Sequence, residues 1–225
     1  MAGLATDSIG LIYINCAAII LMCGIIIHTG IYRRRGFLVD RLFFAMLVLN
    51  ICLASLDIFE CVFGDRGLAQ ASVPLWIENI LFSIVAQVIW FLFALYFMCA
   101  VRREAQVRKY WKLYSIPMFV TFIAVFVNIF FGFLYDVDMA TGTFSYGPFY
   151  NALYIAPLVY AVIICVQLGR LQKILIVFFI LLLLIRFLPS LFLEGLSSTS
   201  FYFALIMTYL HIFRTNYDFQ KEGER

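Results

Sequence analysis

Ionisable side chains lie inside apolar stretches of this sequence, at spacings that place them on one face of a helix. In the second apolar stretch, Asp57 and Glu60 follow Asn50 at intervals of seven and three residues, so the three side chains share a face. An ionisable side chain in hydrocarbon costs a few kcal/mol or more, so each one is by default a candidate site. The chemistry available to such carboxylates is ion pairing or the binding of a polar ligand.

Two further apolar stretches carry polar side chains that recur every four residues. They are Asn79, Ser83 and Gln87, with Glu78 beside them, and Arg186, Ser190 and Glu194. At ~1.5 Å per residue, Asp57 lies ~24 Å beyond Arg41. Arg186 lies ~20 Å beyond Lys173 on the same rise. Because a hydrocarbon core is ~30 Å thick, these side chains are expected in its outer half.

The three stretches predict an outward-facing polar pocket lined by the second, third and sixth spans. Its candidate ligand-binding residues are Asp57, Glu60, Glu78, Asn79, Gln87 and Arg186, and its structural polar residues are Asn50, Ser83 and Ser190. Arg186 is expected to pair with Asp57 or Glu60. The alternative is that these side chains only hold helices together, as polar groups between membrane helices commonly do.

Catalytic and cofactor motifs are absent from the sequence. It contains no HExxH, no GxSxG, no Gly-rich phosphate loop and no CxxC, and its six cysteines lie in or beside apolar stretches. The last apolar stretch, FYFALIMTYLHIF, has no lysine for a Schiff base with retinal. We therefore predict a protein that is not an enzyme and that has no cofactor, metal site or disulfide. His28 and His211 are expected at similar depth, near the cytoplasmic ends of the first and last helices.

Membrane helices must position these side chains. With 65% hydrophobic and 13% charged residues in a chain of 225, the sequence is more apolar than a soluble core requires. We predict an all-α membrane protein, a bundle of seven transmembrane helices, since lipid-exposed backbone must satisfy its own hydrogen bonds. The spans are expected at about 9–31, 38–63, 74–100, 110–134, 148–168, 172–193 and 198–214.

Four clusters contain 14 of the 16 Lys and Arg residues and separate the apolar stretches. They are Arg33, Arg34, Arg35 and Arg41; Arg102, Arg103, Arg108, Lys109 and Lys112; Arg170 and Lys173; and Arg214, Lys221 and Arg225. Basic residues in short loops stay on the cytoplasmic side, so the N-terminus is predicted outside and the C-terminus in the cytoplasm. The clusters flank spans instead of forming one continuous face, so no nucleic-acid partner is expected.

The longest connection predicted on the outer side is DVDMATGTFSYGPF, in which Thr-Gly is flanked by residues that can pair as a small hairpin. It is interpreted either as a lid over the outer mouth or as a plain connection. Pro117, Pro157 and Pro189 can kink the fourth, fifth and sixth spans. Residues 1–214 are predicted to form the membrane domain, and residues 215–225 a cytoplasmic tail or the start of a linker to an output domain.

Several segments together resemble a known group of proteins. The first is the basic segment RRRGFLVDRLFFAMLVLN, which leads into a second helix with an Asn-to-Asp spacing. The others are FSYGPFY, at the entry to the fifth helix, and ALIMTYLHIFRTNYDF, in the last helix. With seven short-looped helices and an outer N-terminus, they look like the seven-helix sensor regions of bacterial signalling proteins that precede diguanylate cyclase (GGDEF) or histidine kinase domains. No such output domain follows Arg225 in this sequence, so the resemblance implies no enzymatic activity.

The resemblance implies a multi-pass plasma-membrane sensor that detects a small ligand or a membrane state from outside. The last helix would pass the change to a cytoplasmic output domain or partner protein, and a homodimer is a further candidate assembly. The alternative is a small transporter or carrier that uses Asp57, Glu60, Glu78 and Arg186 as a substrate or proton site. A third interpretation is an interaction scaffold that binds no ligand.

Overall fold

The computed structural model describes residues 2–32, 38–63, 72–101, 104–138, 144–171 and 199–223. Its helices are α1 (Ala2–Tyr32), α2 (Leu38–Phe63), α3 (Ser72–Val101), α4 (Glu104–Tyr114), α5 (Ile116–Phe131), the 3₁₀ helix η3 (Tyr150–Tyr154), α6 (Ile155–Leu171) and α8 (Thr199–Gly223). Its two strands are β1 (Tyr135–Val137) and β2 (Phe144–Tyr146). Helices therefore make up most of the described part of the chain.

Four helical segments are long and apolar enough to cross a membrane. They are Ile9–Gly30, Leu38–Phe63, Val73–Cys99 and Val107–Phe131, and two shorter apolar helical segments cover Tyr150–Val166 and Thr199–Ile212. The prediction of an all-α membrane protein is confirmed. The predicted span 172–193, which contains Arg186 and Ser190, lies outside the described residues, so the count of seven spans stays a prediction.

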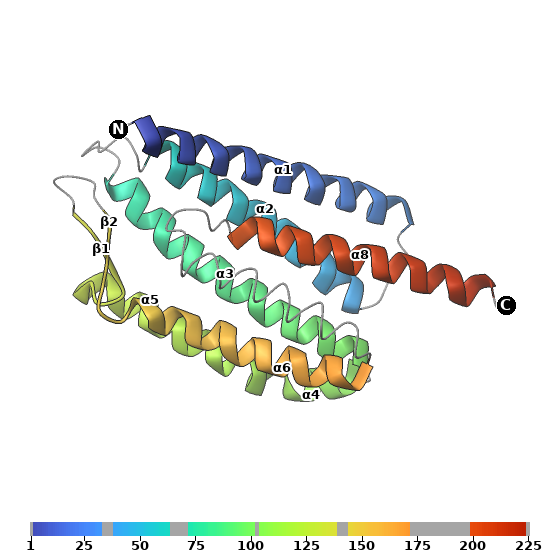
Figure 1. Ribbon diagram of the computed structural model, residues 1–225. Coiled ribbons are helices and arrows are strands. Elements are labelled where there is room, and N and C mark those ends of the chain that lie inside the picture. Colours follow the sequence, from blue (N-terminus) through green and yellow to red (C-terminus); the bar gives the residue numbers. More distant parts are fainter. Residues whose placement is uncertain are drawn as a thin grey trace.

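Helix α3 lies between two groups of helices. It packs against α2 on one side and against α5 and α6 on the other, and α1 packs against both α2 and α8 (Figure 1). The N-terminus and the β1–β2 hairpin lie at one end of the bundle, here called the hairpin end (Figure 1). Helix α4 and the C-terminus lie at the opposite end, here called the α4 end (Figure 1).

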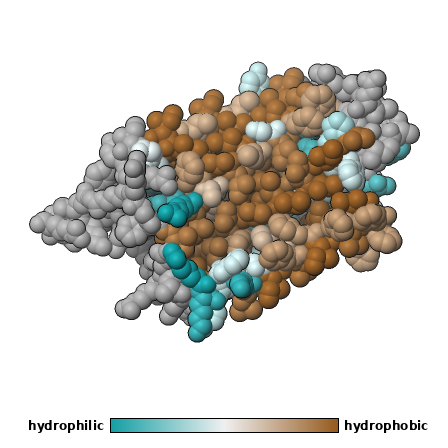
Figure 2. Space-filling view, turned by 180° about the vertical axis from the view of Figure 1, so that it is seen from behind, coloured by the Kyte–Doolittle hydropathy of each residue, from teal (hydrophilic) through white to brown (hydrophobic). Residues whose placement is uncertain are grey.

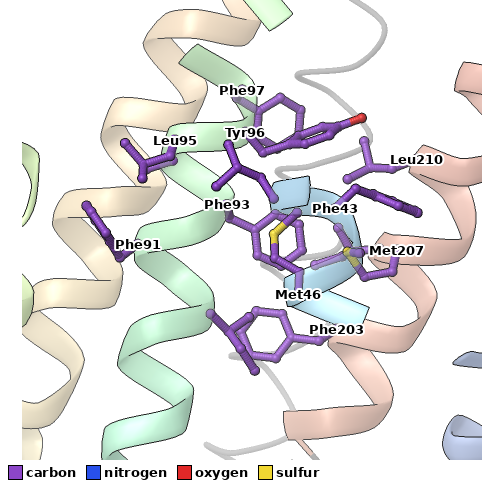
Figure 3. Packing of buried hydrophobic residues seen from close by; sticks show 14 of the residues in the cluster. Phe43, Met46, Phe91, Phe93, Leu95, Tyr96, Phe97, Phe203, Met207 and Leu210 are labelled. Atoms are coloured by element: carbon purple, nitrogen blue, oxygen red, sulfur yellow. The ribbon is translucent and has the colours of Figure 1, made fainter. Parts of the chain in front are cut away.

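Aromatic side chains fill the contact between α2, α3 and α8 (Figure 3). The ring of Phe93 stacks on that of Phe203, with centroids 5.5 Å apart and an interplanar angle of 20°. Phe93, Phe43 and Met46 are each no more than 1% exposed. The large apolar rings pack closely in this contact. Close packing holds membrane helices together, because the surrounding lipid is as apolar as the protein.

The outer surface of the bundle is apolar across its middle. Figure 2 shows this broad apolar surface, with hydrophilic residues gathered toward the two ends. Phe119, Ile123, Phe126 and Phe130 on α5 are each more than half exposed. Exposed side chains of this kind suit a lipid environment, which agrees with the assignment as a membrane protein.

The fourth predicted span is interrupted between α4 and α5. Ser115 there is in a turn, and Pro117 follows in the first turn of α5, where a proline is tolerated. The hydroxyl of Tyr160 on α6 accepts a hydrogen bond from the Met118 N–H (3.1 Å) and donates one to the Tyr114 carbonyl (2.9 Å). Tyr160 thus replaces the backbone hydrogen bond that would join these two groups in an unbroken helix. The interruption lies where Pro117 is expected to kink the span.

Replacing Tyr160 by phenylalanine is expected to lower the free energy of unfolding by about 1–3 kcal/mol, because two backbone groups lose their partner in an apolar environment. Tyr160 is 0% exposed, so water cannot take the place of the hydroxyl. Denaturation by sodium dodecyl sulfate in mixed micelles measures the change. Tyr13→Phe, at a position that is 71% exposed, is the matched control. Equal effects at the two positions would contradict the bridging role of Tyr160.

Candidate polar site at the hairpin end

A buried polar network connects α8 to α1 and α2. The Ser200 hydroxyl lies within hydrogen-bonding distance of Asn15 Oδ1 and is 2.8 Å from Asp57 Oδ2. The Asn50 Nδ2 group donates a hydrogen bond to the Ser200 carbonyl at 3.1 Å. All four side chains are at most 9% exposed. We call Asn15, Asn50, Asp57 and Ser200 the Ser200 network.

Glu78 on α3 is a buried carboxyl group close to this network. It is 3% exposed, and neither of its oxygens has a hydrogen-bond partner in the described part of the chain. Glu60 and Asp57 are near enough to interact with it electrostatically. The structure therefore brings together three of the predicted pocket residues, Asp57, Glu60 and Glu78.

Other predicted pocket residues have partners of their own. Asn79 donates from Nδ2 to the Leu75 carbonyl of the same helix (2.9 Å), as a local helical bond. Gln87 donates from Nε2 to the Leu153 carbonyl of η3 (3.0 Å) and so connects α3 to the entry of α6. Their roles in ligand binding stay predictions. Arg186 and Ser190 lie outside the described residues, and so does any pairing of Arg186 with Asp57 or Glu60.

The predicted hairpin is present and its two strands are antiparallel. Tyr135 is opposite Tyr146, and Asp136 is opposite Ser145. Asn128 near the end of α5 fixes the start of the hairpin: its Oδ1 accepts from the Leu134 N–H (2.6 Å), and its Nδ2 donates to the Tyr135 carbonyl (2.9 Å). No spacing in the sequence singles out Asn128.

A glycine permits the close return of the chain after β2. A Cβ atom on Gly147 would lie 2.3 Å from the Phe133 carbonyl oxygen, which no side chain could occupy. The Gly147 N–H donates instead to the Leu134 carbonyl at 2.8 Å. Asn128 therefore holds the start of the hairpin to α5, and Gly147 closes the hairpin against the segment that precedes β1.

Two tyrosines lie near carboxyl groups at the hairpin end. Tyr135 is 2% exposed and lies near Glu78 and beside Ser83. Burial raises the pKa of the Tyr135 hydroxyl to about 12, so it is protonated at neutral pH. Tyr150 lies near Glu60, and its ring centroid is 4.5 Å from that of Tyr146. The hairpin and η3 therefore bring tyrosine side chains close to two of the acidic residues.

Two histidines meet at the other end of the bundle. His211 Nε2 on α8 lies 3.1 Å from His28 Nδ1 on α1, and the His211 ring also stacks on Phe43. The similar depth expected for these histidines agrees with this contact. Because Asn15 pairs with Ser200 and His28 with His211, α1 and α8 run parallel and are joined at two levels.

Asn15 and Ser200 are the members of the Ser200 network that were not predicted from the sequence. Each is a polar side chain within or at the edge of an apolar stretch. That signal could have identified them, but neither belongs to a repeated polar spacing.

Metal binding by acidic or histidine clusters finds no geometric support in the ranges described. They contain no group of three or more His, Cys, Asp or Glu side chains that could hold a metal ion.

No protein-family model matches the chain, and no curated protein or solved structure is significantly similar to it. The likeness to bacterial sensor regions therefore stays an interpretation of the sequence.

Proposed function

We propose that this protein is a membrane-embedded sensor module. A small ligand or a membrane state would act at the polar site of the hairpin end, and α8 would carry the change to a cytoplasmic output domain or partner. The observation that supports this most directly is the position of Ser200. It is the second residue of α8 and contacts the buried Asp57 of α2, which in turn interacts with Glu78.

The mechanism we propose is a shift between two packings of α8 against α1 and α2. A buried carboxylate interacts strongly with a neighbouring charged group or hydrogen-bond donor. A change of charge at Glu78 would alter the stability of the Asp57–Ser200 hydrogen bond relative to arrangements in which this bond is broken. Such a shift requires only that the two packings differ in their interaction with the ligand.

The proposed topology has seven spans, with the N-terminus outside and the C-terminus in the cytoplasm of the cell. The two chain ends lie at opposite ends of the bundle (Figure 1), as an odd number of spans requires. Exposed basic side chains of α4, such as Arg108 and Lys112, lie at the same end as the C-terminus. This placement agrees with the rule that basic residues remain on the cytoplasmic side.

Helix α8 is suited to transmit the signal because it continues beyond its apolar segment. In the sequence the apolar run ends at Phe213, before Arg214, whereas the helix ends at Gly223. Ten further residues at ~1.5 Å each extend it by ~15 Å. The tail expected after residue 214 is thus largely helical, which is the form that a linker to an output domain would take.

The test measures whether the Ser200 network sets the position of α8. Spin labels at Ile116 on α5 and Ile212 on α8, positions that are 51% and 53% exposed, report the distance between these helices at the α4 end. They are placed in a protein whose six cysteines are replaced. We expect Asp57→Asn to shift the population of distances, because a neutral amide replaces the carboxylate that Ser200 contacts.

The control pair is Ile116 with Phe44, which lies on α2 and is 38% exposed. The distance distribution of this pair should be unchanged by Asp57→Asn. The proposal is wrong if Asp57→Asn leaves both distributions unchanged in a folded protein. A change of equal size in both pairs would indicate general loosening of the bundle, and it would also contradict a specific movement of α8.

A further inference from the structure

Exposed basic side chains gather on α4, the helix that lies at the α4 end of the bundle (Figure 1). The helix contains three basic residues and one acidic residue, Glu104, so its net charge is positive. Lys109 and Lys112 are exposed and lie three residues apart, which places them on one face of the helix. The Lys109 Nζ atom lies 5.4 Å from the centre of the Tyr110 ring. Such a face attracts an anionic group.

Two aromatic side chains beside these lysines mark the level of a membrane surface. Tyr110 and Trp111 are 41% and 44% exposed, so each ring is partly packed and partly accessible. Tyrosine and tryptophan are enriched where hydrocarbon meets the lipid headgroups, because each has an apolar ring with one polar group. Lysine side chains extend toward the headgroups in the same region. The position of Lys109 and Lys112 therefore suits the phosphate of a lipid headgroup.

An exposed stripe leads from Lys112 along α5. Ile116 and Phe119 follow Lys112 at intervals of four and seven residues and are 51% and 53% exposed, and these intervals keep one face of a helix. The turn at Ser115 preserves the helical phase. Its backbone has φ −79° and ψ −12°, and its carbonyl accepts a hydrogen bond from the Phe119 N–H at 3.0 Å. The two lysines and the apolar face of α5 therefore belong to one surface.

An apolar groove between α3 and α5 continues this surface. Its volume is about 390 Å³, which is within the usual range for ligand pockets. Its lining includes Ile84 on α3 and Phe119 and Ile123 on α5. Phe119 lies ~10 Å beyond Lys112 along the helix. The hydrocarbon of one leaflet is ~15 Å thick, half of the bilayer core, so an acyl chain below a headgroup at Lys112 reaches the groove.

We propose that α4 and α5 form a binding site for an anionic phospholipid. The phosphate lies beside Lys109 and Lys112, and the glycerol backbone lies at the level of Tyr110 and Trp111. One acyl chain follows Ile116 into the groove between α3 and α5. An anionic lipid is preferred to phosphatidylcholine, because the choline group carries a positive charge that the lysines repel. This inference goes beyond the proposed function and concerns a surface separate from the Ser200 network.

The test compares phosphatidylglycerol with phosphatidylcholine of the same acyl chains. Native mass spectrometry of the full chain, released from a neutral detergent with an equimolar mixture of both lipids, gives the ratio of the two bound lipids. We expect phosphatidylglycerol to be preferred about tenfold or more, and the double variant Lys109→Gln/Lys112→Gln to lose most of this preference. Arg41→Gln is the matched control, because Arg41 is an exposed cation near the start of α2. It should leave the ratio unchanged.

The contact with the acyl chain is tested separately at Phe119. Phe119→Ala should lower the apparent affinity for phosphatidylglycerol about threefold or more, because apolar contact with the chain is lost. Phe131→Ala removes the same atoms from a side chain that is 76% exposed at the other end of α5, and it should have no effect. Glycerol 3-phosphate, which has the phosphate without acyl chains, should not displace the lipid at equal concentration.

Several results would overturn the proposal. Equal binding of the two lipids, or equal effects of Arg41→Gln and the double lysine variant, would mean that no selective site exists on α4. Displacement by glycerol 3-phosphate would mean that the lysines bind a soluble phosphate, and an unchanged affinity in Phe119→Ala would mean that no acyl chain occupies the groove. A dimer in the same spectra that Phe119→Ala dissociates would assign the groove to a second copy of the chain.

Discussion

Replacing Phe93 by alanine is expected to lower the free energy of unfolding by about 3–5 kcal/mol, the usual cost of removing a buried phenylalanine side chain. Phe93 is 1% exposed and has aromatic neighbours on two helices, with ring centroids 6.4 Å from Phe97 and 5.5 Å from Phe203. Phe93 lies between α3 and α8 in Figure 3, so its truncation removes packing between these helices. The packing between these two helices is therefore weakened directly.

The measurement is equilibrium denaturation by sodium dodecyl sulfate in mixed micelles. Phe131→Ala, at a position that is 76% exposed, removes the same atoms from a side chain that faces lipid or detergent. It should change the free energy of unfolding by about 0.5 kcal/mol or less. Similar losses for the two variants would mean that the aromatic contact of α3 with α8 does not hold the bundle together.

The helices could be predicted from the sequence because apolar stretches of membrane length have few alternatives to a helix. The bounds expected for the second span, 38–63, are those of α2, Leu38–Phe63. The hairpin was also predictable, because Thr-Gly stands between two short segments that can pair. Its register, with Tyr135 opposite Tyr146, needed the structure.

The contacts of the polar site were only partly predictable, since helical spacing shows which residues share a face but not which helix that face meets. The spacing of Asn50 and Asp57 identified one side of the Ser200 network. Their partners Ser200 and Asn15 are far away in the sequence, and they come together only because α8 packs against α1 and α2.

Tyr160 gave no sequence signal at all, since it is one of 13 tyrosines and its role depends on the break near Pro117. A proline in a span indicates that a backbone hydrogen bond is lost. It does not indicate which neighbouring side chain will replace that bond.

Replacing Ser200 by alanine is expected to lower the free energy of unfolding by about 1–3 kcal/mol, because a hydrogen-bonding hydroxyl is removed from beside a buried carboxyl and a buried amide. Ser200 is 0% exposed, so solvent does not restore the hydrogen bond to Asp57. Ser55→Ala is the matched control. The Ser55 hydroxyl is exposed on α2 and donates to the Ile51 carbonyl of the same helix, so its loss should cost about 0.5 kcal/mol or less.

A double-mutant cycle tests whether Ser200 acts through Asp57, as the proposed movement of α8 requires. Ser200→Ala and Asp57→Leu each remove one side of the 2.8 Å contact, so the second change should cost less once the first is present. For side chains in direct contact, the expected coupling free energy is about 0.5–3 kcal/mol. Additive effects would mean that α8 is held by Asn15 and Asn50 without Asp57. A change of charge at the neighbouring Glu78 would then have no route through Asp57 to α8.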